Sequence, residues 1–125
     1  MPLGDQLVEK RALQEGPLFV AIADIELKKG KEEEFKKWFL QSNRALEGQD
    51  GLIARRLLKS PRGDGQQQQQ RTATGKMPMV MIMVVMKSRE AFANMHMTPE
   101  HAKLHAEALS FMTRPPRISA YDAVL

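Results

Sequence analysis

The feature that most constrains the fold is an alternation of side chains over residues 18–28. All odd positions of this segment are apolar: Phe19, Ala21, Ala23, Ile25 and Leu27. The even positions are apolar at first and polar afterwards: Leu18, Val20 and Ile22, then Asp24, Glu26 and Lys28. A period of two is typical of a β-strand, because successive side chains point to opposite faces of a sheet. The segment therefore predicts a strand with one buried face and a second face that is apolar for half its length.

The next segment has the period of a helix. Its apolar residues recur every three or four positions: Phe35, Trp38, Phe39, Ala45 and Leu46. Glutamates at positions 32–34 suit a helix N-terminus, where negative charge is favourable, and Gly48 and Gly51 end the pattern. We expect an amphipathic helix over residues 31–47, followed by a strand over residues 52–59.

The second half of the sequence continues the alternation of strands and helices. Four elements are expected: a strand over 79–86, a short helix over 89–96, a helix over 99–113 and a strand over 118–125. Thr98 and Pro99 mark the start of the longer helix, because threonine caps a helix and proline fits its first position. The order strand, helix, strand, strand, helix, strand is typical of an α+β fold of the ferredoxin-like, split β-α-β type, with a four-stranded antiparallel sheet.

One face of this sheet is predicted to lack a cover. Helices on one side leave the opposite face open, and on the first strand that face begins with Leu18, Val20 and Ile22. An exposed apolar sheet face implies a partner. We expect a homodimer formed through the sheet face, since a second copy offers a complementary apolar surface. Asp24 and Glu26 share this face and are expected to pair with Arg55 or Arg56 across the interface.

Length and composition limit the function classes. The 125 residues fit one domain over residues 17–125, preceded by an N-terminal arm over 1–16. A flexible polar hairpin insertion with five consecutive glutamines is expected over 60–76. The absence of cysteine excludes disulfides, iron–sulfur clusters, cysteine-ligated zinc and thiolate catalysis.

Neither a membrane nor a nucleic acid is expected as a partner. The longest apolar run, residues 77–86, is about half of the roughly 20 residues that a membrane-spanning helix needs. No secretory signal is visible, so a cytoplasmic location is expected. The net charge is only +4. The strand over 79–86 has none of the aromatic side chains on which RNA-binding domains of this topology stack bases.

Three histidines are the candidate chemical groups. His101 and His105 are four residues apart on one predicted helix, so they share a face that is otherwise apolar. They can line a cavity as polar groups, act as bases or substrate contacts, or form a metal pair, for which no third ligand is suitably spaced. His96 precedes the cap of that helix and either closes the end of the pocket or faces solvent.

Several segments carry a resemblance to a known family. They are FVAIADIELKKGK at 19–31, DGL at 50–52, MKSREAF at 86–92 and YDAV at 121–124. The most specific is the segment from His96 to His101, HMTPEH, which is similar to a His-x-x-Thr-Pro-His motif with the last histidine one residue later. In this order, over residues 17–124, they resemble the antibiotic biosynthesis monooxygenase family of dimeric α+β barrels.

This resemblance implies a cofactor-independent monooxygenase that acts on a small aromatic, polyketide or quinol-like substrate with molecular oxygen as co-substrate. His101 or His105 would be the base, with His96 nearby. The pocket would be shaped by four residues: Ala23, Trp38, Met86 and Met95. Trp38 also has the spacing of a core residue. Seven of the nine methionines fall between positions 77 and 97, and we expect them along the pocket wall.

The family also contains haem-degrading enzymes and members without known activity. The haem-degrading motif of asparagine, tryptophan and histidine falls on Ala23, Met95 and His105, so only the histidine is kept. Haem is therefore disfavoured as a cofactor. The alternatives to an oxygenase are a dimer that binds haem or another apolar ligand without catalysis, and a family member with no catalytic activity.

Overall fold

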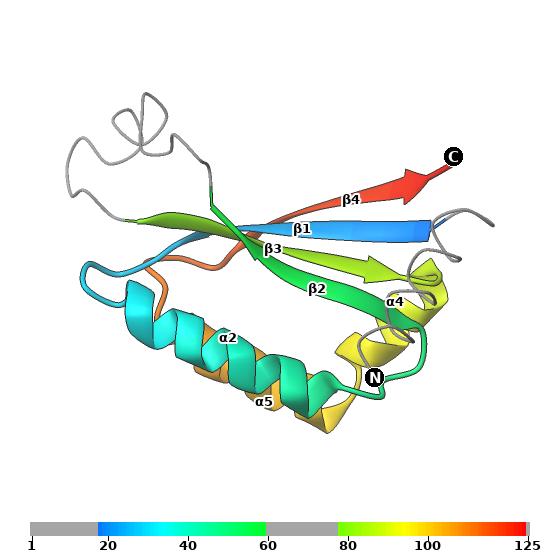
Figure 1. Ribbon diagram of the computed structural model, residues 1–125, viewed down its shortest axis with the longest axis horizontal. Coiled ribbons are helices and arrows are strands. Elements are labelled where there is room, and N and C mark those ends of the chain that lie inside the picture. The colour runs from blue at the N-terminus through cyan, green and yellow to red at the C-terminus, as the bar shows by residue number, and fades with distance from the viewer. Residues whose placement is uncertain (1–17, 60–77, 125) are drawn as a thin grey trace, which may run out of the picture.

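The computed structural model describes residues 18–59 and 78–124, so the predicted arm and hairpin insertion lie outside the described residues. Its elements are β1 (Leu18–Glu26), α2 (Glu32–Leu46), β2 (Leu52–Leu58), β3 (Met79–Met86), α4 (Arg89–His96), α5 (Pro99–Leu109) and β4 (Arg117–Ala123). Four strands form one antiparallel sheet in the order β2-β3-β1-β4. The predicted α+β ferredoxin-like fold is confirmed. The three helices lie on one side of the sheet (Figure 1).

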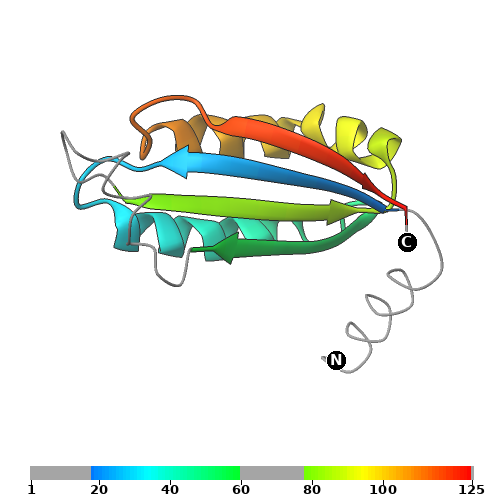
Figure 2. The same cartoon turned by 90° about the horizontal axis from the view of Figure 1, so that it is seen from above.

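The two faces of the sheet follow the alternation of β1. Phe19, Ala21 and Ile25 lie on the helix-covered face, where they join the core that α2, α4 and α5 close. Leu18 and Val20 lie on the opposite face, which we call the open face (Figure 2). The pairing of β1 with β3 carries the alternation to the neighbouring strand, because directly paired residues share a face.

Helix α2 supplies much of the core. Its buried residues follow the predicted stripe: Phe35, Trp38, Phe39, Ser42 and Leu46. Gly48 and Gly51 after the helix have positive φ values, +88° and +81°, which glycine adopts without strain. A Cβ at Gly51 would also clash with the Cβ of Ala91, so this glycine allows α4 to approach the start of β2.

A β-bulge near the start of β2 decides which side chains of that strand face the helices. Leu52 pairs with Met86, but Ala54 rather than Ile53 pairs with Val85. Two consecutive residues therefore occupy the open face, and the alternation is reversed beyond them. As a result Arg55 points beneath the helices.

Several element ends differ from the sequence expectation. β1 stops at Glu26 rather than Lys28, and Leu27 makes only an isolated bridge with Met112. Helix α5 ends at Leu109 rather than at residue 113, because the chain turns at Phe111 to bring its carbonyl to the amide of Lys28. None of the helices in residues 18–59 and 78–124 has the length and hydrophobicity that a membrane crossing requires.

The expectation that the methionines of the third strand line a pocket is wrong. The register pairs Met83 with Ile22, Met81 with Asp24 and Met79 with Glu26. These three methionines therefore lie on the open face. Sequence spacing predicted the strand, but only its register against β1 shows on which side each methionine falls.

Candidate functional site

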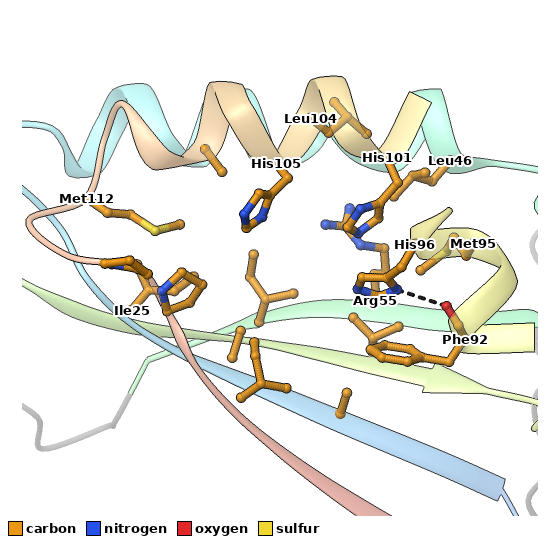
Figure 3. Close-up of a pocket in the computed structure, with 18 of the residues that line it drawn as sticks. Ile25, Leu46, Arg55, Phe92, Met95, His96, His101, Leu104, His105 and Met112 are labelled. Atoms are coloured by element: carbon orange, nitrogen blue, oxygen red, sulfur yellow. Dashed lines mark hydrogen bonds between the residues drawn. The ribbon is translucent and has the colours of Figure 1, made fainter. Parts of the chain in front are cut away.

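A cavity of about 270 Å³ lies between α4, α5 and the helix-covered face of the sheet (Figure 3). Its floor is made of small and aliphatic side chains from three strands: Ala21, Ala23, Ile25, Ile82, Val84 and Ile118. Trp38 and Leu46 of α2 close one side, and Phe92 and Met95 of α4 close one end. The walls are predominantly apolar, which suits an apolar organic ligand.

Helix α5 forms the opposite wall. The hydroxyl of Thr98 accepts a hydrogen bond from the amide of His101 (3.2 Å), which fixes the first turn, and Pro99 occupies the first helical position. Because the start of the helix is fixed, residues three and four positions apart lie on the one face that borders the cavity. That face carries His101, Leu104, His105 and Ala108. The predicted sharing of one apolar face by His101 and His105 is confirmed.

His96, His101 and His105 form what we call the histidine row. The ring centroids of His96 and His101 are 3.9 Å apart, and those of His101 and His105 are 6.5 Å apart with the rings nearly parallel. The His96 ring also packs on Phe92 at 4.0 Å. Its Nδ1 lies 2.9 Å from the Phe92 carbonyl oxygen, which can only accept, so Nδ1 carries a proton. In neutral His96 the lone pair is then on Nε2.

Burial favours the uncharged forms of His101 and His96. Loss of hydration lowers the pKa of His101 to about 4, and the positive charges of His96, His105 and Arg55 add to this effect. Loss of hydration also lowers the pKa of His96, although the hydrogen bond to Phe92 opposes it. At neutral pH His101 is therefore an imidazole with a free lone pair, and protonating it would place a cation in an apolar wall.

Arg55 is a charged lining residue that could not be assigned to the site from the sequence. Its Nη1 donates to the hydroxyl of Ser42 (2.7 Å) and to the amide oxygen of Asn43 (2.6 Å), and the guanidinium lies 4.9 Å from the centre of the Phe39 ring. Loss of hydration lowers the pKa of Arg55 to about 10, so it stays charged at neutral pH. Two consecutive arginines in an apolar strand were the available signal, but alternation alone could not say which one turns inward.

The structure places the other predicted site residues unevenly. Ala23, Trp38 and Met95 line the cavity, and Trp38 also belongs to the core and donates from Nε1 to Glu107 (3.2 Å). Met86 is fully buried in the cluster beneath α4 and is not part of the cavity wall. Met112 lies in the wall instead, beside the end of α5.

The expected pairing of open-face carboxylates with arginines needs one correction. Arg55 lies beneath the helices, so it cannot reach across the open face, and that half of the expectation is wrong. Arg56 pairs with Met83 and lies on the open face. Its ion pair with Asp24 or Glu26 across the interface remains a prediction. The Glu26 carboxylate accepts a hydrogen bond from the hydroxyl of Thr113 (2.6 Å) within the same chain.

Neither a metal nor haem has a matching set of groups here. Within the described residues, no three His, Asp or Glu side chains are arranged to hold a metal ion. Ala23 and Met95 both line the cavity, and they offer a methyl group and a thioether where haem-degrading relatives carry an amide and an indole. His105 alone remains as a ligand. The residues present do not fit haem degradation.

Comparison with known proteins gives a consistent result for the fold. No family model matches the sequence, and no curated protein matches it significantly. Among solved structures, a protein of Caulobacter crescentus provisionally named an antibiotic biosynthesis monooxygenase superposes with a TM-score of 0.68 and 19% identity, over 93% of this chain and 98% of the other. The chain has the fold of the antibiotic biosynthesis monooxygenases.

Two further structures agree. A Nitrosomonas europaea protein provisionally given the same name has a TM-score of 0.67 and 17% identity, over 86% of this chain and 90% of its own. A variant of SnoaB, a cofactor-independent oxygenase of Streptomyces nogalater, has a TM-score of 0.64 and 12% identity, over 83% and 90%. The resemblance to the antibiotic biosynthesis monooxygenases is thus supported at the level of the fold, while activity and substrate have to be argued from the cavity.

Proposed function

We propose that this protein is a cofactor-independent monooxygenase of a small aromatic or quinol-like substrate. The observation that carries the proposal is the pair His101 and His105, which border one apolar cavity of about 270 Å³. Cofactor-free oxygenation needs a base and a dry space that protects the oxidised intermediate. The likeness to SnoaB, a cofactor-independent oxygenase, supports the same class.

The proposed reaction begins with a proton transfer from a phenolic hydroxyl to a histidine. The phenolate then gives one electron to dioxygen, and the two radicals combine into a carbon–oxygen bond at a ring carbon that carries hydrogen. The resulting peroxide anion takes the proton back from the histidine and becomes a hydroperoxide. Loss of water from this hydroperoxide leaves a carbonyl. One oxygen atom enters the product and the other leaves as water. The substrate supplies all four electrons that reduce dioxygen, so no added reductant is required.

We assign proton acceptance to His105 and substrate positioning to His101. A pKa of about 4 makes His101 a weak base, although its lone pair can accept a hydrogen bond from the substrate hydroxyl. His105 follows one turn later on the same wall and is more exposed, so water can solvate its charged form. The two rings are nearly parallel, with centres 6.5 Å apart on the same wall.

Oxygen consumption with a panel of hydroquinones and naphthols tests this assignment. His105→Gln should lower turnover at least about 100-fold, the usual lower bound for loss of a general base. His101→Gln should raise KM more than it lowers kcat. Lys103→Gln, on an exposed position of the same helix, is the matched control. Unchanged turnover in the His101→Gln, His105→Gln double variant would remove both histidines from the mechanism.

We also propose that two copies associate through the open face. Its partly exposed apolar residues include Val20, Ile22 and Met83, and Tyr121 of β4 lies on the same face with 55% of its surface exposed. Such a surface on a sheet favours association. Light scattering at micromolar concentration should give about twice the mass of a 14.2 kDa chain. A monodisperse monomer would contradict this.

A second candidate function is binding of an apolar ligand without catalysis. The neutral state of His101 favours it, because an uncharged hydrogen-bonding group in an apolar wall is sufficient for binding. If this is correct, aromatic ligands bind, as judged by the fluorescence of Trp38, but no oxygen is consumed with any of them. Hemin can be titrated in parallel. A Soret shift that His105→Ala abolishes would favour haem as the ligand.

A further inference from the structure

We propose that the cavity selects an organic anion, in which a carboxylate held by Arg55 lies next to the apolar part of the ligand. This inference rests on the proposed function only in taking the cavity as the substrate site. It narrows the substrate class from small aromatic compounds to aromatic or other apolar acids. Four observations support it: the partners of Arg55, the edge of its guanidinium that remains available, the charge of the lining, and the bulge that turns Arg55 inward.

The partners of Arg55 do not balance its charge. Ser42 and Asn43 accept its hydrogen bonds, and both are neutral. Among residues 18–59 and 78–124, no carboxylate forms an ion pair with it. Removing a guanidinium from water is costly unless an anion compensates for the lost hydration. Arg55 is among the lining residues, so a ligand in the cavity can supply that anion.

The geometry of the guanidinium leaves a suitable edge. Both hydrogen bonds are made by Nη1, which has two hydrogens, so these hydrogens are used. Nε and Nη2 carry two parallel N–H groups, and no acceptor for them occurs in the described part of the chain. A carboxylate fits this pair with two parallel hydrogen bonds, which is the strongest arrangement that arginine offers. Figure 3 shows the Arg55 side chain in the part of the cavity where His96 and His101 lie.

The remaining lining points to the same ligand class. It includes Arg55 and the three members of the histidine row, but no aspartate or glutamate. The carboxylate of Glu107 accepts a hydrogen bond from Trp38 and is outside the lining. A cationic ligand would meet uncompensated repulsion, and a neutral ligand would leave Arg55 unpaired. The apolar floor suits the hydrocarbon part of an acid.

The bulge in β2 is what turns Arg55 toward the cavity. Regular alternation from Leu52 would have placed Arg55 on the open face and Arg56 beneath the helices. The extra residue at Ile53 brings Arg55 into the wall and turns Arg56 outward, where it is exposed. Bulges commonly re-aim a side chain beside a binding site. A purely structural contact with Ser42 and Asn43 would need a hydrogen-bond donor, but not a permanent charge facing a cavity.

Fluorescence titration provides the test, because Trp38 is the one tryptophan of the sequence and lines the cavity. The ligands are 4-phenylbutyrate and its uncharged counterpart 4-phenylbutanol. We expect the acid to bind about tenfold or more tightly than the alcohol, as a charge-assisted bidentate pair implies. Arg55→Gln keeps a donor for Ser42 but lacks the charge, and should abolish the preference while still binding the alcohol. Arg55→Lys should keep part of it.

Arg56→Gln is the matched control and should preserve the preference, because Arg56 lies on the opposite face. Circular dichroism and retained binding of the alcohol show that Arg55→Gln is folded. If that variant does not fold, Arg55→Lys decides, and a preference undiminished in it counts against the bidentate contact. Equal affinity for acid and alcohol in the wild type would overturn the proposal, as would a preference that survives in Arg55→Gln or failure of both ligands to bind.

These titrations consume no oxygen, so the two proposals can fail separately. An Arg55-dependent preference without oxygen uptake, including with hydroxynaphthoates, would reject the oxygenase and leave the anion site intact. Oxygen uptake with neutral hydroquinones, together with no preference for the acid, would reject the anion site and leave the oxygenase proposal intact.

Discussion

The two faces of the sheet are formed by the same strands but differ in side-chain size and in what covers them. On the helix-covered face, Ala21 and Ala23 are small, so α5 does not fill the space above them and a cavity remains. On the open face, larger apolar residues such as Val20 and Ile22 are half-buried and lie beside polar residues. Beneath the helices, the size of the strand side chains therefore decides whether the space is filled or left as a cavity, whereas the open face is suited to association.

Arg55 and Arg56 are neighbours in the sequence that lie on opposite faces of the sheet. They are adjacent and chemically identical, yet one is enclosed near α2 and the other is exposed. The backbone oxygen of Arg55 even accepts a hydrogen bond from the Arg56 side chain (3.1 Å). Arg55→Gln and Arg56→Gln are therefore a matched pair of variants for the anion test. The variants below compare the two faces at other positions.

The largest effect should come from the core beneath the helices. Phe35 is 0% exposed and packs against Trp38 and Phe111 at ring-centre distances of 5.2 and 5.8 Å. Phe35→Ala should lower the free energy of unfolding by about 3–5 kcal/mol, because it removes these contacts and leaves a cavity. Urea unfolding measures this. Leu40→Ala, at an exposed position of the same helix, should change it by less than about 0.5 kcal/mol. Similar losses in both variants would contradict the assignment of the core.

A charge on the open face should act on association rather than on the fold. Ile22 pairs with Met83 and Ser119 near the middle of the sheet. Ile22→Arg should convert the expected dimer into a monomer while the circular dichroism spectrum is unchanged. Met97→Arg, at a site that is 81% exposed, should leave the mass unaffected. If the mass of Ile22→Arg stays at that of the wild type, the open face is not the interface.

His101 should make stability depend on pH. The folded pKa of His101, about 4, is below its unfolded value of about 6.5. The unfolded chain therefore binds more protons between these values, and stability falls as pH falls from 7 to 4. We expect a loss of about 1–2 kcal/mol from His101 after allowing for partial exposure. The neighbouring charges are those of His96, His105 and Arg55.

Urea unfolding at several pH values, compared between the wild type and His101→Gln, isolates this contribution from the carboxylates that titrate in the same range. The variant should show a shallower decline between pH 7 and pH 4. Parallel declines would mean that His101 gains no such shift on folding.

The smallest effect should come from an exposed ion pair. Arg89 of α4 donates from Nη2 and Nε to the carboxylate of Asp122 on β4, at 2.8 and 3.2 Å. Both side chains are well exposed, so water and salt screen the interaction. Arg89→Gln should melt within experimental error of the wild type. A clear destabilisation would show that this pair, and not only the apolar contacts, holds α4 on the sheet.

Much of the fold could be predicted from local patterns. Alternation predicted β1, the helical stripe predicted α2, and the cap at Thr98 predicted the start of α5. These features depend on residues a few positions apart, which is why they are legible in one sequence. The element ends were less accurate where long-range contacts decided them, as at Leu27 and Met112.

For the candidate site too, local patterns predicted some features and long-range packing decided the others. The helical period alone was enough to place His101 and His105 on one apolar helix face. Only the tertiary structure decided that His96 packs against His101, that Met86 is outside the cavity, and that Arg55 faces it. Each of these depends on how separate elements are placed against one another, and for Arg55 a single extra residue in β2 reversed the alternation. Local periodicity specifies which residues share a face, whereas register and packing decide what that face meets.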